Sequence, residues 1–114
     1  MVVLTIGNDI KIFEDGSASQ KKAVEIATLF KEYYIVVYAE KSLGLKMKRI
    51  SKNAWAIPTN SSNRWFYVID AIRIGRKMSG IDVVSAQDLE SGLVAYPVSR
   101  YLKARFQLQI HTDF

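Results

Sequence analysis

The chain's single histidine is the side chain best suited to proton transfer or hydrogen bonding near neutral pH. His111 follows the strand-like stretch at residues 106–110, and Asp113 lies two residues beyond it. An imidazole at the end of a buried strand can act on a ligand, or it can bond a backbone carbonyl. Asp113 can orient that ring or cap a turn. Spacing alone leaves both interpretations open for each residue.

A carboxylate near the middle of the chain is a second candidate. Asp88 comes just after the strand-like run at residues 81–86. It can bind sugar hydroxyls, hold a cation or cap the helix that follows it. A turn at Asp15-Gly16 precedes Ser17, which can cap the first helix. The candidate groups therefore follow three separate strand-like stretches.

Several kinds of site are disfavoured by what the sequence lacks. The loop between Gly7 and Gly16 lacks the three closely spaced glycines of a dinucleotide-binding fingerprint, and no Gly-Lys-Ser/Thr triplet of a P-loop occurs. No serine lies in a nucleophile-elbow pattern. Cysteine is absent, which excludes thiolate metal sites and cysteine nucleophiles. We therefore predict neither a metal site nor a bound cofactor.

Composition indicates one domain over residues 1–114, with 49% apolar residues and a net charge of +5. Apolar stretches fall short of the roughly 18 residues of a membrane span, and no signal peptide is evident, so we predict a cytoplasmic protein. No Lys/Arg run exceeds two residues, which argues against nucleic-acid binding. A basic cluster could contact an anionic membrane face or form a solvated loop. It comprises Lys46, Lys48, Arg49 and Lys52.

The elements that must position these residues can be read from hydropathy. Apolar, β-branched and aromatic residues predict strands at residues 2–6, 34–39, 54–58, 81–86 and 106–110, with a short edge strand at 45–50. Helical periodicity predicts helices at 18–33, 64–78 and 90–103, with Pro97 disturbing the last. Residues 59–63 offer several caps for the second helix. Trp65, Phe66 and Tyr67 at its start could pack in the core or stack on a ligand.

Strands that alternate with helices predict an α/β fold. We expect a Rossmann-like three-layer α/β/α arrangement with a mainly parallel sheet of about five strands. The carboxyl ends of parallel strands meet at one edge, where such folds bind ligands. The loop at residues 7–16, Asp88 and His111 should therefore line one concavity.

Several stretches, in this order and spacing, resemble the N-terminal domain of family 4 glycosyltransferases. They span nearly the whole chain: Val3-Leu4-Thr5-Ile6-Gly7-Asn8-Asp9 with Phe13-Glu14-Asp15-Gly16-Ser17-Ala18, Pro58-Thr59-Asn60-Ser61 with Arg64-Trp65-Phe66-Tyr67, Ser85-Ala86-Gln87-Asp88 with Glu90-Ser91-Gly92-Leu93, and Gln109-Ile110-His111-Thr112-Asp113-Phe114. The resemblance implies a truncated N-terminal half of a GT-B fold, in which two Rossmann-like domains face a cleft.

The resemblance also implies roles for individual residues. His111 matches a histidine that reaches the donor sugar and the reaction centre, so it is the predicted catalytic residue. Gln87 and Asp88 match a cleft-facing turn where the acceptor binds. Gly16 and Ser17 belong to a loop that closes over the donor phosphates or the acceptor. With Asp113, these four are the predicted substrate-binding residues.

The resulting prediction is the acceptor-side domain of a retaining, metal-independent glycosyltransferase, inactive alone. It would transfer a sugar from a nucleotide-sugar donor to a hydroxyl acceptor, either a glycan or a lipid-linked one, without a cofactor. Its partner would be a donor-binding second domain or a second copy of the chain, with peripheral contact at the inner membrane face as a further expectation. Two alternatives are a non-enzymatic Rossmann-like interaction module and a flavodoxin-like binder of a small phosphorylated ligand.

Overall fold

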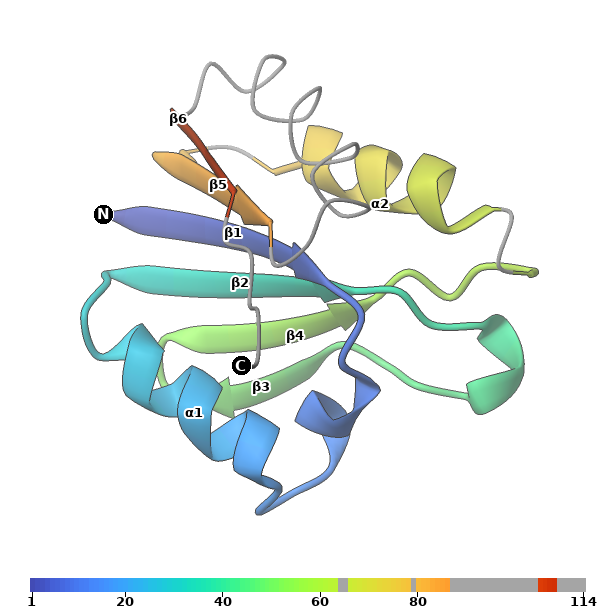
Figure 1. Cartoon of the computed structure of the whole chain (residues 1–114), viewed down its shortest axis with the longest axis horizontal. Helices are drawn as coiled ribbons and strands as arrows, with labels where there is room; N and C mark the ends of the chain where they lie inside the picture. The colour runs from blue at the N-terminus through green and yellow to red at the C-terminus, as the bar shows by residue number, and fades with distance from the viewer. Residues whose placement is uncertain (64–65, 79, 87–104, 109–114) are drawn as a thin grey trace, which may run out of the picture.

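A computed structural model describes residues 1–63, 66–78, 80–86 and 105–108 (Figure 1). Its strands are β1 (Val2–Gly7), β2 (Glu32–Val37), β3 (Lys48–Ser51), β4 (Ala54–Pro58), β5 (Val83–Ala86) and β6 (Arg105–Leu108). Its α-helices are α1 (Ala18–Ala27) and α2 (Tyr67–Arg76), and short 3-10 helices occupy Ile10–Phe13 and Lys41–Leu43. The predicted α/β class is confirmed for the described residues.

The strands form one mixed sheet in the order β3-β4-β2-β1-β5-β6. β1 pairs in parallel with β2 and β5, β2 pairs in parallel with β4, and β5 pairs in parallel with β6. β3 runs antiparallel to β4 at the edge of the sheet. The strand predicted at residues 54–58 has the observed bounds of β4, and the predicted edge strand is present as β3.

The two helices cover opposite faces of the sheet, which explains why its central strands are continuous apolar runs. Leu4 and Ile6 of β1 pack with Ala71 of α2 on one face, called here the α2 face. Val3 of β1 packs with Ala23 of α1 on the other, the α1 face. Successive side chains of a strand point to opposite faces, so a strand buried on both has no polar alternation.

The first helix is shorter than its sequence pattern predicts. α1 ends at Ala27 with Thr28 as its C-cap, whereas the periodicity of apolar residues extends to Tyr33. Residues from Glu32 onward instead pair with β1, where Val2 lies opposite Glu32. β-branched and aromatic side chains after residue 32 gain more from the sheet than from another helical turn. The helix prediction was therefore wrong over its last six residues, 28–33.

The second helix also starts later than predicted. α2 begins at Tyr67, and no side chain caps its N-terminus. Phe66 is 44% exposed, whereas Tyr67 packs against the core of the α2 face. Trp65 and the helix predicted at residues 90–103 lie outside the described residues. No helix within residues 1–63, 66–78 and 80–86 is long and apolar enough to cross a membrane.

The basic cluster is partly engaged within the fold. Arg49 of β3 lies 5.4 Å from the ring centroid of Trp55 and donates to the Ser51 carbonyl at 3.2 Å. Trp55 in turn stacks on Tyr34, with ring centroids 5.0 Å apart. Both faces of the Trp55 ring are therefore occupied, and its contacts connect β4 with β3 and β2.

Tyr34 should titrate at unusually alkaline pH. Its hydroxyl donates to the Glu32 carboxylate, and this hydrogen bond, followed by burial, raises the pKa of Tyr34 to about 12. The unfolded phenol titrates near pH 10. The pair therefore stabilises the fold fully below about pH 10, and this contribution is lost as the pH rises through about 12.

Ultraviolet absorption measures the formation of phenolate as the pH rises. Subtracting the titration of Tyr34→Phe from that of the unchanged chain isolates the Tyr34 ring. Removing the acceptor charge with Glu32→Gln should return the Tyr34 pKa toward its ordinary value. If Tyr34 titrates at the same pH in the unchanged chain and in Glu32→Gln, the Glu32 carboxylate does not raise the pKa of Tyr34.

Candidate functional site

The carboxyl ends of β1, β2, β4, β5 and β6 lie at the same edge of the sheet. β1 lies between β2 and β5, so the chain order changes direction around it. Ligands of α/β sheets bind at such switch points, outside the strand ends. The predicted residues after β5 and β6 lie outside the described residues, so their roles stay predictions. They are Gln87, Asp88, His111 and Asp113.

The loop between β1 and α1 contains the predicted turn and helix cap. Gly16 adopts a φ of +80°, a conformation that suits glycine. Ser17 Oγ accepts from the Gln20 amide at 3.1 Å and donates to the Lys11 carbonyl at 2.6 Å. The cap is therefore confirmed. A role of Gly16 and Ser17 in substrate binding stays a prediction, and the Ser17 hydroxyl is already engaged inside the loop.

Lys48 of β3 fastens this loop to the sheet. Its Nζ lies 2.6 Å from Asp15 Oδ1 and donates to the Phe13 carbonyl at 3.2 Å. Hydrogen bonding to Lys48 and to Gln20 lowers the pKa of Asp15. An ion pair this exposed to solvent contributes little to stability. Its effect here is to restrict the position of the loop that follows β1.

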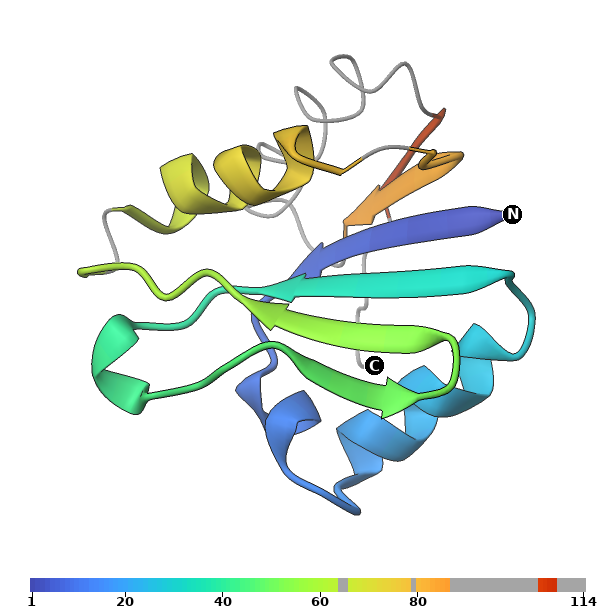
Figure 2. The same ribbon diagram turned by 180° about the vertical axis from the view of Figure 1, so that it is seen from behind.

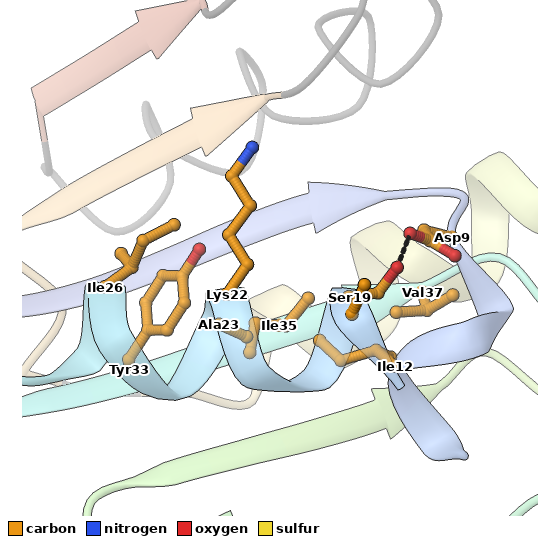
Figure 3. Close-up of a pocket in the computed structure, with 10 residues that line it drawn as sticks. Asp9, Ile12, Ser19, Lys22, Ala23, Ile26, Tyr33, Ile35 and Val37 are labelled. Carbon is orange, nitrogen blue, oxygen red and sulfur yellow. Dashed lines mark hydrogen bonds between the residues drawn. The ribbon is translucent and has the colours of Figure 1, made fainter. Parts of the chain in front are cut away.

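A cavity of about 340 Å³, the α1-side cavity, lies between α1 and the sheet (Figure 3). Its walls are mainly apolar, and Asp9 and Ser19 form its polar end. The Ser19 hydroxyl donates to Asp9 Oδ2, and the Lys11 amide donates to Asp9 Oδ1 at 3.0 Å. Each carboxylate oxygen thus has a partner, so Asp9 chiefly shapes the loop.

A second cavity of about 500 Å³, the α2-side cavity, lies beyond the carboxyl ends of β1 and β2. Three segments contribute to it: the loop after β1, the loop after β2 and the first residue of α2. Figure 2 shows the loop after β2 projecting beyond the sheet edge. The lining residues are Asn8, Ile10, Tyr38, Ala39, Glu40, Leu43 and Tyr67.

The buried Thr59 hydroxyl and the Ser61 backbone hold the segment that carries Glu40. Thr59 Oγ1 accepts from the Ala39 amide at 2.9 Å and donates to the Ala39 carbonyl at 3.1 Å. The Lys41 amide donates to the Ser61 carbonyl at 2.7 Å, and Ser61 is fully buried. Glu40 therefore lies between two anchored residues, and its backbone is fixed to the loop after β4.

Asn60 connects these two anchors with a φ of +49°. Such left-handed backbone is uncommon outside glycine, although asparagine tolerates it better than most residues. Residues 59–63 were predicted to offer caps for the second helix, but Thr59 and Ser61 bond the loop after β2 and no side chain caps α2. Only their position after a strand, beside an asparagine able to turn, could have signalled this role.

The α2-side cavity combines hydrogen-bonding groups with apolar surface. Asn8 and Glu40 supply an amide and a carboxylate, and Ile10 and Leu43 are 45% and 52% exposed beside them. The rings of Tyr38 and Tyr67 are stacked with centroids 5.4 Å apart. No group of three His, Asp or Glu side chains suited to a metal ion occurs among the described residues. The cavity therefore presents hydrogen-bonding groups and apolar surface side by side.

Comparisons with models of protein families, with curated proteins and with solved structures found no match to this chain.

Proposed function

We propose that the chain is the acceptor-side domain of a retaining glycosyltransferase, which acts with a donor-binding domain. It would bind a hydroxyl acceptor and present it to a nucleotide-sugar donor. The observation that carries the proposal is the α2-side cavity beside the switch point at β1. Asn8, one of its lining residues, belongs to the Gly7-Asn8-Asp9 stretch that resembles family 4 glycosyltransferases.

The strand order and the helices on opposite faces of the sheet support a Rossmann-like interpretation of the fold. Catalysis in such an enzyme rests on orienting the acceptor and stabilising the leaving diphosphate. The described residues of this chain supply groups for the first task. His111 and Asp88 remain the proposed contacts to the donor sugar and the acceptor.

Deletion of the gene in its native cells tests the proposal without isolating any domain. We expect one glycan or glycolipid to disappear and a compound that lacks one sugar to accumulate, as measured by mass spectrometry. Re-expression of the chain with His111→Ala should fail to restore the product, whereas the unchanged chain should restore it. An unaltered glycan and glycolipid profile after deletion would overturn the proposal.

A further inference from the structure

The α2-side cavity has a lining that discriminates between classes of small ligand. Its volume, about 500 Å³, lies within the range of roughly 300–1,000 Å³ that is typical of small-molecule sites. Among the described residues that line it, Glu40 is the one that carries a charge. A carboxylate repels phosphates and other anions, and it accepts hydrogen bonds from hydroxyl groups. This charge disfavours nucleotides and sugar phosphates.

The polar groups of the cavity are matched by apolar surface. Ile10 and Leu43 are about half exposed and line the cavity together with Asn8 and Glu40. Tyr67 adds a half-buried ring that is already stacked on Tyr38 on one side. A ligand that covers these residues must itself present an apolar face.

The frame of the cavity is fixed before any ligand binds. Thr59 and Ser61 anchor the residues on either side of Glu40, and the Tyr38 amide donates to the Gly7 carbonyl at 3.0 Å. The loop that carries Glu40 therefore loses little conformational entropy when a ligand binds. A small ligand that makes few contacts can then still bind.

From this lining we infer that the α2-side cavity binds a neutral sugar ring. The ring hydroxyls would bond the Asn8 amide and the Glu40 carboxylate, and one C–H face would pack on Leu43, Ile10 and Tyr67. A sugar pyranose has both features, hydroxyls at its rim and an apolar face. The inference rests on the proposed function, for which it specifies the acceptor as a neutral glycoside.

Binding to the full chain can be measured by saturation-transfer NMR and titration with a panel of methyl glycosides. The matched panel consists of the corresponding sugar 1-phosphates and nucleoside monophosphates. We expect at least one neutral glycoside to bind in the millimolar range and the phosphorylated compounds to bind more weakly. Glu40→Ala should weaken glycoside binding about tenfold or more, because a charge-assisted hydrogen bond is lost.

Two pairs of variants separate the cavity from general surface effects. Leu43→Ala should weaken binding severalfold, whereas Leu29→Ala, at a residue that is 77% exposed outside the cavity, should not. Glu25→Ala on the exposed side of α1 is the control for Glu40→Ala. Leu43 and Glu40 are not part of the buried core, so these variants should retain the fold, as checked by circular dichroism.

Three results would overturn the inference: no glycoside binding, preferential binding of phosphates, or glycoside binding that persists in both Glu40→Ala and Leu43→Ala. These outcomes are distinguishable from failure of the proposed function. Glycoside binding with an unchanged cellular profile after gene deletion would retain the sugar site and reject the transferase. An altered glycan profile after gene deletion, without glycoside binding, would retain the transferase and reject the sugar site.

Discussion

Leu4→Ala should lower the free energy of unfolding by about 2–5 kcal/mol. Leu4 is fully buried on the α2 face, where it packs with Ala71 and with Val36 and Val84 of the neighbouring strands. These neighbours belong to β1's two parallel partners and to α2, so no single element can move to fill the space. The loss therefore combines reduced burial with a residual cavity, and it is a large fraction of the about 5–15 kcal/mol of a typical domain.

Urea unfolding, followed by circular dichroism, measures this difference directly. Ile69→Ala provides the control, because Ile69 lies on α2 and is 52% exposed. We expect a change within about 1 kcal/mol for that substitution. A loss below about 1 kcal/mol for Leu4→Ala would mean that the α2 face is not packed as described.

The sequence predicted the sheet well because its central strands are buried on both faces. Val3 and Leu4 are neighbours in β1, yet they belong to the cores of opposite faces. Such a strand needs apolar residues at every position, and that continuous run is visible without a structure. The bounds of β4 were predictable for the same reason and because Pro58 limits it.

Helix ends were harder to predict because local and long-range interactions compete there. Phe30 and Tyr33 continue the helical period, but Tyr33 lies opposite Val3 in the sheet and Phe30 packs beside it. The pairing partner is about thirty residues away in sequence, so hydropathy within one window does not contain it.

The candidate site was predictable only as an edge of the sheet. Ser17 capped α1 as its type and position indicated, since that bond is local. Glu40 was not singled out, because its importance arises from neighbours brought together by the fold. Asn8 lies in the loop after β1, Glu40 in the loop after β2, and Tyr67 begins α2. Nothing in the sequence around any one of them reveals the cavity.

The second large effect is expected from Thr59→Val, which should destabilise the fold by at least about 2 kcal/mol. Thr59 is 6% exposed, and valine matches its shape without the hydroxyl. The Ala39 amide, which donates to Thr59 Oγ1 at 2.9 Å, would lose its buried partner. The Ser61 hydroxyl, which donates to the same oxygen at 3.3 Å, would lose its partner too. Each orphaned buried group costs about 1–3 kcal/mol.

Two further substitutions at threonine sites isolate the role of the hydroxyl. Thr59→Ser keeps the oxygen and should recover most of the lost stability in urea unfolding. Thr28→Val removes a hydroxyl from an exposed threonine, where water can replace it as a partner, and should change the stability by about 0.5 kcal/mol or less. Equal stability of Thr59→Val and Thr59→Ser would show that the hydroxyl does not support the fold.

Thr59→Val should also loosen the α2-side cavity, because the hydroxyl fixes the backbone just before Glu40. Hydrogen exchange measured by NMR should become faster at the Ala39 and Lys41 amides than the change in global stability accounts for. The Val36 amide, in β2 and fully buried, should follow global stability alone and serves as the internal reference. If Ala39, Lys41 and Val36 all shift together, Thr59 contributes to the whole fold. If exchange at Ala39 and Lys41 alone exceeds the global change, the buried Thr59 hydroxyl after β4 sets the position of the Glu40 carboxylate after β2.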